Sequence, residues 1–397
     1  VQSKKGCLQM SKVELYELTI LMPCLNEEKT LLECILKAKK FINSRNISGE
    51  ILISDNGSAD NSVNIAKKNN VRVISTSSRG YGSALINGIK SAKGKYIIMG
   101  DADCSYDFSS LDNFLEKLRG GSDLVMGNRF KGKIFPNAMP FLHKYLGNPI
   151  LSFFGRLFFR SKISDFHCGL RGFSKKSIKT LNLKCKGMEF ASEMVAKAEL
   201  KKLKISEVPI NLFPDKRSRR PHLRTWLDGW RHLKFLLIFS PKWLFLTPGL
   251  FLLITGLIGF AFLISGPIDL VNGRITLHSN SFLVFCVMII VGVQSLTFYN
   301  LMLSIRTQMF PETWGEKNNI FSSKKFEPAL FFSLFLLSLG IVGIFYTINI
   351  WESKSFGDLD FHQISRILYP SITSITCGIQ IFLSLFVYAA VSHINQD

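Results

Sequence analysis

Residues 95–103 read KYIIMGDAD, a short apolar run that ends in a glycine and two carboxylates. The same arrangement, an apolar run followed at once by polar residues, occurs in LTILMPCLNE (18–27) and EILISDNGS (50–58). Segments of helix length separate these runs, and such alternation is typical of a largely parallel sheet with covered faces. We therefore expect an α/β fold whose ligand lies beyond the carboxyl ends of the strands.

This strand-and-helix rhythm extends over residues 18–126. The predicted strands are 18–22, 50–54, 71–74, 95–99 and 123–126, with a further strand at 205–210. Helices are predicted from Glu27, from Asp60, at 82–92 and at 109–119, with Asn26 and Asp60 as N-caps. The predicted fold class is a Rossmann-like domain with a mixed, mainly parallel sheet.

Asp101 and Asp103 directly follow the fourth predicted strand. Two carboxylates at positions i and i+2 of a loop can point at one hard cation, and Mg²⁺ takes only one or two protein carboxylates besides substrate phosphates. A solvated acidic turn has the same residues, but the place at a strand end favours a metal site.

Further downstream, SDFHCGLRGF (164–173) places an acid, Asp165, six residues before a base, Arg171. Two roles for Asp165 stay open at this point: a general base, or a residue that orients Arg171. Arginine binds phosphate with two parallel hydrogen bonds, so Arg129 in GNRF (127–130) is a further candidate.

A basic segment, DKRSRRPHLR (215–224), precedes an apolar stripe of helical period. The stripe consists of Trp226, Trp230, Leu233 and Leu237. A helix with this pattern lies on a membrane surface, and it would hold the basic segment at the level of the lipid headgroups. Residues 149–160, PILSFFGRLFFR, are either a second membrane contact or an ordinary buried helix.

The last third of the chain differs in kind. Residues 1–245 carry a formal charge of +21 and residues 246–397 a charge of −1. Four stretches without Asp, Glu, Lys or Arg, at 243–268, 275–305, 328–351 and 367–396, exceed the ~20 residues that a helix needs to cross a bilayer. We predict membrane helices near 246–266, 281–303, 329–350 and 370–391.

The charges of the connecting loops predict the orientation of these helices, because positive residues in short loops stay in the cytoplasm. Residues 306–327 carry Arg306, Lys317, Lys324 and Lys325, whereas 267–280 carry Arg274 and 352–366 carry Lys354 and Arg366. We expect a catalytic domain (10–222) facing the cytoplasm, an amphipathic interfacial helix (223–242) and a four-helix transmembrane domain (243–397).

Taken together, PCLNE (23–27), DNGS (55–58), DAD (101–103) and D…GLR (165–171) resemble the family 2 glycosyltransferases of GT-A fold, and more narrowly the polyprenyl-phosphate hexose synthases of the dolichyl-phosphate mannose or glucose synthase type. The resemblance covers roughly residues 18–240. It implies transfer of a hexose, with inversion, from a GDP- or UDP-hexose to a dolichyl or undecaprenyl phosphate in the membrane, with Mg²⁺ or Mn²⁺ as cofactor.

The resemblance also implies roles for individual residues. Those for the nucleotide-sugar are Pro23, Leu25, Glu27, Asp55, Gly80, Asp101, Ala102 and Asp103, with Asp55 at the base. The metal would take Asp101, Asp103 and position 105, where this chain has Ser105 and related synthases often have glutamine. Asp165, Arg171 and Arg129 would be catalytic, and Arg129, Arg217 and Arg219 would hold the acceptor phosphate.

Other classes fit less well. A processive polysaccharide or glycolipid synthase shares the fold, but its Q-x-x-R-W motif is missing around LRTW (223–226). A lipid-binding scaffold would not need carboxylates at three strand ends. Nucleic-acid binding would explain the positive charge but not the four apolar stretches, and a transporter would be expected to carry functional charges within them.

Overall fold

The computed structural model describes residues 16–216, 225–270, 275–309 and 326–393. The chain forms two compact units, Val1–Leu236 and Leu237–Asp397. The predicted domain boundaries at 222 and 242 stay predictions.

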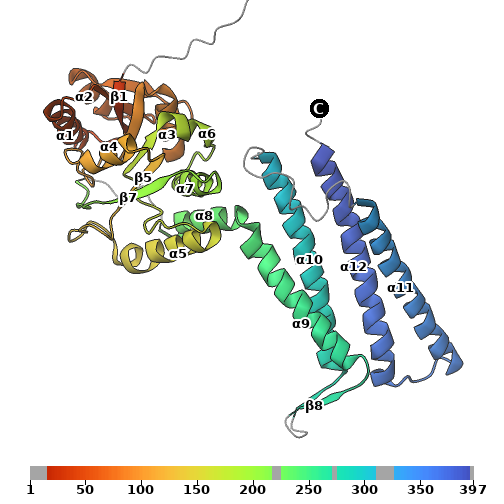
Figure 1. Cartoon of the computed structure of the whole chain (residues 1–397). Helices are drawn as coiled ribbons and strands as arrows, with labels where there is room; N and C mark the ends of the chain where they lie inside the picture. Colours follow the sequence, from red (N-terminus) through yellow and green to blue (C-terminus); the bar gives the residue numbers. More distant parts are fainter. Residues whose placement is uncertain (1–15, 217–224, 271–274, 310–325, 394–397) are drawn as a thin grey trace, which may run out of the picture. The chain divides into compact units, whose positions relative to one another are not determined.

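The first unit is built on a twisted sheet (Figure 1). Its described strands are β1 (Tyr16–Cys24), β2 (Gly49–Asp55), β3 (Arg72–Ser75), β4 (Gly94–Met99), β5 (Leu124–Asn128), β6 (Arg171–Ser174) and β7 (Ile205–Pro209). They are arranged in the order β3-β2-β1-β4-β6-β5-β7, and only β6 runs antiparallel to its neighbours. The mixed, mainly parallel α/β sheet expected from the sequence is confirmed.

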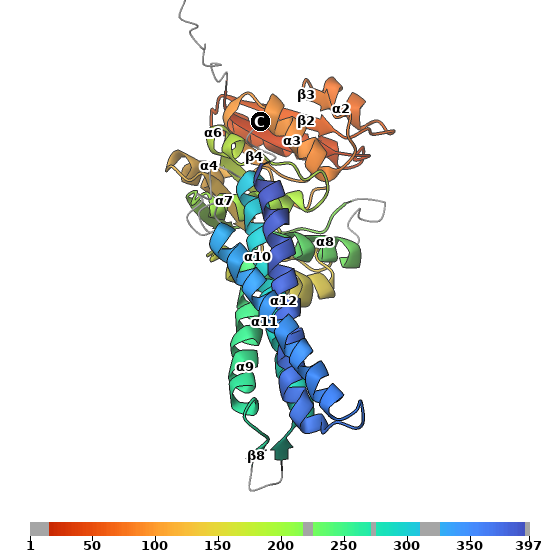
Figure 2. The same ribbon diagram turned by 90° about the vertical axis from the view of Figure 1, so that its right-hand side faces the viewer.

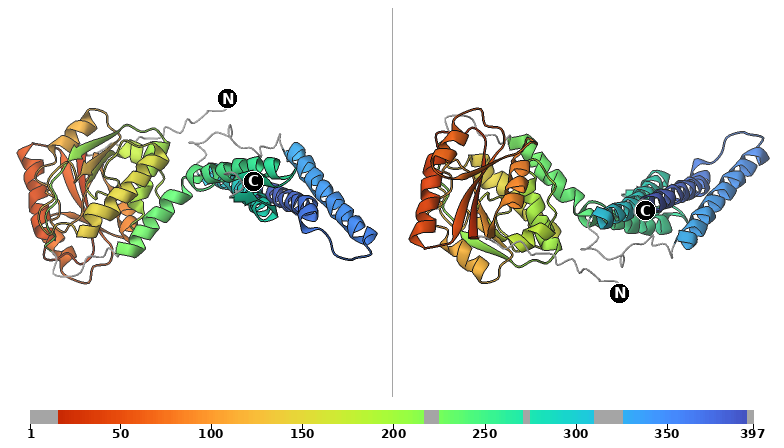
Figure 3. Two further views of the ribbon diagram at one scale, coloured as in Figure 1. Left: turned by 90° about the horizontal axis from the view of Figure 1, so that it is seen from below. Right: turned by 90° about the horizontal axis from the view of Figure 1, so that it is seen from above.

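Helices cover both faces of this sheet (Figure 3). The helices described in this unit are α1 (Leu31–Ser44), α2 (Ser62–Lys68), α3 (Tyr81–Ser91), α4 (Asp112–Arg119), the π-helical turn η1 (His143–Gly147), α5 (Asn148–Phe159), α6 (Lys175–Thr180), α7 (Phe190–Leu200) and α8 (Thr225–Ile238). Side chains of a strand alternate between faces, so Leu18 and Ile20 of β1 join the core with α1 and α4. Leu21 points the other way and packs against Gly88 of α3.

The first helix begins later than the sequence predicted. We expected a helix from Glu27 with Asn26 as its N-cap, whereas α1 starts at Leu31 after Thr30. Asn26 has a φ of 56°, in the left-handed region, and its side chain accepts a hydrogen bond from the backbone of Ala59 instead. Asparagine tolerates this conformation, so the loop after β1 turns before the helix begins.

The second unit contains, among the described residues, four helices long and apolar enough to cross a membrane (Figure 2). The first consists of η2 (Lys242–Leu246) and α9 (Thr247–Leu263), and the others are α10 (Ser279–Met309), α11 (Phe326–Ser353) and α12 (Phe361–His393). The four predicted spans are confirmed. A short hairpin of β8 (Ile268–Leu270) and β9 (Ile275–Leu277) connects α9 to α10.

Small residues let the membrane helices approach closely, as is usual where no water drives their association. A Cβ added at Gly256 of α9 would lie 2.9 Å from the backbone of Phe285 and Ile289 on α10. On the other pair, a Cβ at Gly340 of α11 would lie 2.5 Å from the carbonyl oxygen of Ser371 on α12. Arg274, Lys317, Lys324 and Lys325, on which the predicted orientation depends, lie outside the described residues.

Candidate active site

The carboxyl ends of β1, β2 and β4 meet at one edge of the sheet, because β1 pairs in parallel with both neighbours. Cys24 lies opposite Asp55 at the end of β2, and Leu21 lies opposite Met99 at the end of β4. The residues that follow these strands are therefore neighbours. Pro23 lies within β1, one residue before its end, and Leu25 and Glu27 follow that strand. Asp55 ends β2, and Asp101, Ala102 and Asp103 follow β4.

The loops after β1 and β2 are held together by hydrogen bonds. Asp55 is buried and accepts bonds from the backbone amides of Gly57 and Ser58 at 3.0–3.3 Å. The backbone amide of Glu27, another buried acid, donates to the hydroxyl of Ser62 at 2.8 Å. These hydrogen bonds within the chain fix the two loops, which form one wall of the candidate site.

A further bond ties the loop after β1 to the acidic loop after β4. The hydroxyl of Thr30 donates to the carbonyl oxygen of Ala102 at 2.7 Å, and Ala102 is buried. Asp101 and Asp103, on either side of Ala102, are therefore held in one short, anchored segment.

The donor set of this segment suits a hard divalent cation. Within the described residues no three His, Cys, Asp or Glu side chains converge as a complete metal site. Two carboxylates, Asp101 and Asp103, match the one or two that Mg²⁺ takes when phosphates and water supply the other oxygens. The hydroxyl of Ser105 donates to Oδ1 of Asp103 at 2.5 Å, which favours a role in orienting Asp103 over metal ligation.

Asp101 also contacts residues that sequence reasoning did not select. The hydroxyl of Tyr81 hydrogen-bonds Asp101, and burial, followed by the charge of Asp101, raises the pKa of Tyr81 well above its ordinary value. Tyr106 accepts a bond from the amide of Gly169 at 2.9 Å. A Cβ at Gly169 would lie 2.7 Å from Oδ2 of Asp101, so this position has no room for a side chain.

Arg129 and Asp165 form a buried ion pair. Nε and Nη2 of Arg129 each donate to a carboxylate oxygen at 2.7 Å, and the backbone amide of Arg129 donates at 3.1 Å. Burial alone would lower the pKa of Arg129, but the charge and hydrogen bonds of Asp165 raise it above its usual range. Arg129 therefore stays charged, and Asp165 is the residue that orients it.

Arg171, the other residue that Asp165 is predicted to orient, makes its hydrogen bonds to other groups, and its catalytic role stays a prediction. Arg171 is fully buried and donates to three backbone carbonyls, those of Cys168, Phe166 and Ala191. It starts β6 opposite Met99, the last residue of β4, so its backbone lies at the level of the strand ends while its side chain has no exposed surface. Arg171 thus braces the segment that carries Asp165.

Glu207 on β7 supports the same segment, and the motif search did not find it. It accepts from the backbone amides of Ser164 and Asp165 at 2.6 and 3.2 Å and pairs with Lys131 at 2.8 Å. Burial would raise the pKa of Glu207, but these partners lower it below its ordinary value. A glutamate in an alternating strand carries no local sign of this role.

Gly80 lies where two backbones touch. Its φ is 134°, and a Cβ there would lie 2.2 Å from the carbonyl oxygen of Lys186. Its amide donates to the side chain of Asn56 at 2.8 Å, one residue after Asp55. Gly80 therefore lets the loop before α3 close against the loop after β2.

The basic segment begins beside the acidic loop. The backbone amide of Lys216 donates to the carbonyl oxygen of Asp103 at 3.2 Å, and its ammonium pairs with Glu33 at 2.7 Å. Arg217 and Arg219, predicted to hold the acceptor phosphate, follow directly but lie outside the described residues.

Helices α5 and α8 pack on one loop of the site. The amide of Phe166 donates to Ser152 of α5 at 3.2 Å, and Ser192 bridges the rings of His167 and His232 at 3.1 and 2.9 Å. His232 belongs to α8. The charge of Arg129, after burial, lowers the pKa of His143 in η1, so that turn lies near the ion pair.

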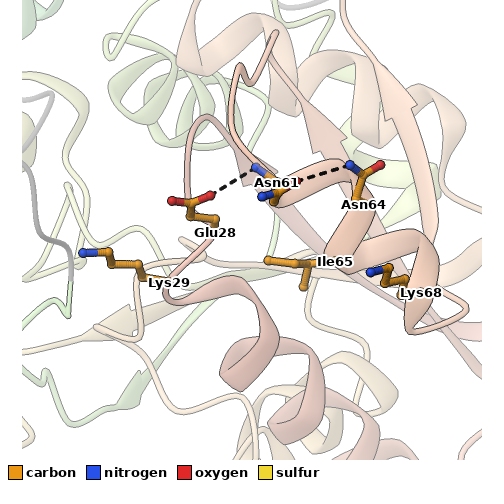
Figure 4. Close-up of a pocket in the computed structure, with 6 residues that line it drawn as sticks. All are labelled: Glu28, Lys29, Asn61, Asn64, Ile65 and Lys68. Atoms are coloured by element: carbon orange, nitrogen blue, oxygen red, sulfur yellow. Dashed lines mark hydrogen bonds between the residues drawn. The ribbon is translucent and has the colours of Figure 1, made fainter.

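A hollow of about 520 Å³ lies elsewhere on the unit, between the loop before α1 and α2 (Figure 4). Its lining residues are Glu28, Lys29, Asn61, Asn64, Ile65 and Lys68, and Glu28 accepts a bond from the amide of Asn61. It contains none of the predicted site residues, and we do not assign the active site to it.

Two family models match this chain. Residues 19–181 match the model described as Glycosyl transferase family 2, and residues 303–392 match the Glycosyltransferase family 2 C-terminal transmembrane region. The first match covers the strand ends described above, and the second begins within α10 and ends within α12.

Curated proteins and solved structures are similar as well. The low-salt glycan biosynthesis hexosyltransferase of Haloferax volcanii is 40% identical over 250 residues, which cover 63% of this chain and 60% of that protein. The dolichol-phosphate mannosyltransferase of Mycosarcoma maydis is 27% identical, with coverage of 55% and 76%. A crystal structure of glucosyl-3-phosphoglycerate synthase from Mycobacterium tuberculosis matches with a TM-score of 0.45 and 17% identity over 57% of this chain and 80% of that one.

Proposed function

Because the chain belongs to glycosyl transferase family 2, we propose that this glycosyltransferase moves a hexose from a GDP- or UDP-hexose to the phosphate of a polyisoprenyl lipid, dolichyl or undecaprenyl. The observation that carries the proposal is the grouping of Asp55, Asp101 and Asp103 at three neighbouring strand ends, beside a segment that holds a buried, charged Arg129. A sugar donor with two phosphates needs carboxylates that can hold a metal ion, and a lipid acceptor with one phosphate needs a positively charged group.

Asp101 and Asp103 would hold Mg²⁺ or Mn²⁺, which when bound neutralises charge on the departing nucleoside diphosphate. Tyr81 and Ser105 fix these two carboxylates by hydrogen bonds. Asp55 and Glu27 form the wall where the nucleoside would lie, and Gly80 closes that wall.

The acceptor needs little help from a base. The second pKa of a phosphate monoester is about 6, so the acceptor is already an anionic nucleophile at neutral pH. Its oxygen would attack the anomeric carbon while the bond to the β-phosphate oxygen breaks, which gives a glycosyl phosphate lipid, a nucleoside diphosphate and inversion. Asp165 is fully buried and bound to Arg129 through both oxygens, which favours the orienting role over the base.

An exposed apolar face next to the ion pair supports a lipid acceptor. On η1 and α5, and just before them, Phe141, Tyr145, Leu146, Ile150 and Phe153 are exposed, and Trp226 and Trp230 are exposed on α8. The two largest exposures are 73% for Phe141 and 77% for Trp226. Both helices pack on Phe166 and His167, so this face lies beside the segment of Asp165.

We infer that this face rests on the membrane, because aromatic side chains are favoured at the headgroup level. The opposite side of α8, with His232 and Leu236, is buried in the domain. Helix α8, Thr225–Ile238, lies within the interfacial helix proposed for 223–242. A lipid phosphate at that depth would reach Arg129, and Arg217 and Arg219 remain proposed as its other ligands.

We propose that the catalytic domain faces the cytoplasm. The support is the excess of lysine and arginine in the 306–327 connection over the two loops at the other end of the spans. Nucleotide-sugars are charged solutes, and a domain that uses them has to be on the side of the membrane where they are supplied.

One experiment tests the proposed reaction. The full chain is purified in neutral detergent and incubated with polyprenyl phosphate and a panel of radiolabelled GDP- and UDP-hexoses, with and without EDTA. We expect one donor to label the lipid, with loss of labelling in EDTA and recovery on addition of Mg²⁺ or Mn²⁺. No labelled lipid with any donor would contradict the proposed acceptor, and full labelling in EDTA would contradict the metal.

A further inference from the structure

A second site lies in the membrane unit, at the ends of three spans. A cavity of about 140 Å³ opens where α9 finishes at Leu263 and where α10 and α12 begin. The span that starts at Lys242 ends at Leu263, so the cavity is at the other end of that span, at the depth of lipid headgroups. Its volume equals several water molecules at ~30 Å³ each, enough for a phosphate group and the start of its chain.

The polar side of the cavity carries one fixed positive charge, that of Arg366. Arg366 of α12, His278 and His362 line it, and among the eight described residues of its wall none is acidic. Within the described part of the chain, Arg366 forms no hydrogen bond or ion pair, although its side chain is half-buried. Among the residues that the structure describes, no carboxylate pairs with this guanidinium, which stays charged at any physiological pH.

The hydrogen bonds of Ser279 bear on which ring nitrogen of His362 can donate to a ligand. Ser365 donates to Ser279 at 2.8 Å, and Ser279 lies 2.9 Å from Nδ1 of His362. The hydroxyl of Ser365 also reaches the carbonyl oxygen of His362 at 3.1 Å, and where it donates to Ser279 the proton of Ser279 points to Nδ1, so that a neutral His362 carries its proton on Nε2. Ser279 is also the first residue of α10, and the unbonded amides of a helix start add positive potential.

The other side of the cavity is apolar. Leu263 and Phe282 are almost fully buried and belong to a cluster that includes Cys286, with Tyr369 packed against it. A cationic rim above an apolar floor suits a ligand with an anionic head and a hydrocarbon tail. A free inorganic anion would use the rim but leave the floor without a partner.

We propose that this cavity binds the phosphate group of an anionic lipid. The shared chemistry is a lipid-borne phosphate, and its source is either a phospholipid headgroup or an isoprenoid phosphate. Arg366 supplies the charge, His362 and the start of α10 supply hydrogen-bond donors, and Leu263 and Phe282 contact the chain. The proposal concerns residues far along the sequence from the candidate active site and does not depend on the proposed transfer reaction.

Native mass spectrometry of the delipidated full chain in neutral detergent tests this site, with phosphatidylglycerol, polyprenyl phosphate and phosphatidylcholine as probes. Arg366→Gln should weaken binding of a lipid phosphate by about tenfold or more, as expected for loss of a charge-assisted bond. Arg366→Lys should keep most of it. The matched control is Lys354→Gln, which removes an exposed charge from the connection between α11 and α12 and should change binding less than twofold.

The comparison between wild type and variant isolates this cavity, because lipid bound at the catalytic domain is the same in both. Weaker phosphatidylglycerol binding in Arg366→Gln identifies a phospholipid site, and weaker polyprenyl phosphate binding alone identifies an isoprenoid site; either result supports the proposal. Equal binding of all probes by wild type and Arg366→Gln would overturn it, as would equal losses in Arg366→Gln and Lys354→Gln. The measurement reports lipid binding and not activity, so it tests this cavity even if the protein transfers no sugar to a lipid.

Discussion

Arg129 grips both carboxylate oxygens of Asp165, with Nε and Nη2 each at 2.7 Å, although 36 residues separate the two in sequence. Asp165 is completely buried and Arg129 nearly so. A planar guanidinium meets a carboxylate in this two-bonded geometry, and an ammonium does not. The pair therefore fixes both the charge and the direction of Arg129 beside the strand ends.

Replacement of Arg129 by lysine should distinguish the effect of the positive charge at this position from the effect of its orientation by Asp165. Arg129→Lys keeps a positive charge but loses the two parallel hydrogen bonds to Asp165. We therefore expect transfer to fall by about ten- to 150-fold while donor binding stays near wild type. Steady-state kinetics with varied acceptor and a nucleotide-binding titration measure the two effects. Asp165→Ala should instead unfold the domain, because a lone buried charge costs about 3–5 kcal/mol. An Arg129→Lys enzyme with normal turnover would refute the assigned role.

Asp103→Asn should lower turnover by at least ~10²-fold, since it removes one carboxylate from the proposed metal site. The matched control is Asp112→Asn, because Asp112 is an exposed acid paired with Arg45 on the same domain. That control should retain transfer within twofold. Initial rates over a Mn²⁺ titration provide the measurement, and equal rates for both variants would rule out the metal assignment.

Gly169→Ala should damage the site without unfolding the domain. The added methyl would meet Oδ2 of Asp101 at 2.7 Å and push that carboxylate out of position. We expect at least a tenfold loss of transfer with a melting temperature close to wild type. Gly229→Ala is the control, because a Cβ there has open space in α8. Equal activity of the two variants would show that Asp101 tolerates displacement.

The histidines behind the site predict a loss of stability in acid. Burial lowers the pKa of His232 to about 4, and burial with the charge of His232 lowers that of His167. In the unfolded chain the histidine pKa is near 6.5, so between pH ~6.5 and 4 the unfolded chain binds protons that the folded chain does not bind. The free energy of unfolding should therefore decrease as pH falls from ~6.5 toward 4, by up to about 1.4 kcal/mol per pH unit for each histidine.

Thermal unfolding of wild type and His232→Gln across this pH range measures the effect. The variant has one fewer buried neutral histidine, so its melting temperature should fall less steeply with acid. Parallel curves for the two proteins would mean that His232 takes up its proton in the folded state as easily as in the unfolded one.

The proposed orientation predicts which positions an impermeant thiol reagent reaches in intact cells. In a background without the native cysteines, Ser355→Cys, in the exposed connection between α11 and α12, should be labelled from outside. Lys40→Cys, exposed on the catalytic domain, should be labelled only after the membrane is opened. The opposite pattern would reverse the topology.

Local sequence was enough for the architecture. Apolar runs such as 95–99 and spans such as 281–303 are specified by period and length, and neither depends on distant parts of the chain. The acidic residues at the strand ends also follow from local order, because parallel neighbours place their carboxyl ends together. The antiparallel β6 was not foreseen, since four residues reading RGFS carry no strand period.

Only the tertiary structure decided which residues of the site form hydrogen bonds and ion pairs with one another. Asp165 and Arg171 share a motif, yet the antiparallel insertion of β6 between β4 and β5 turns Arg171 into the interior and leaves Arg129, at the end of β5, to meet Asp165. The support of Glu207 and the closeness of Gly169 to Asp101 arise in the same way. Periodicity reports which face of an element is buried, whereas ion pairs depend on how elements from distant positions are placed side by side.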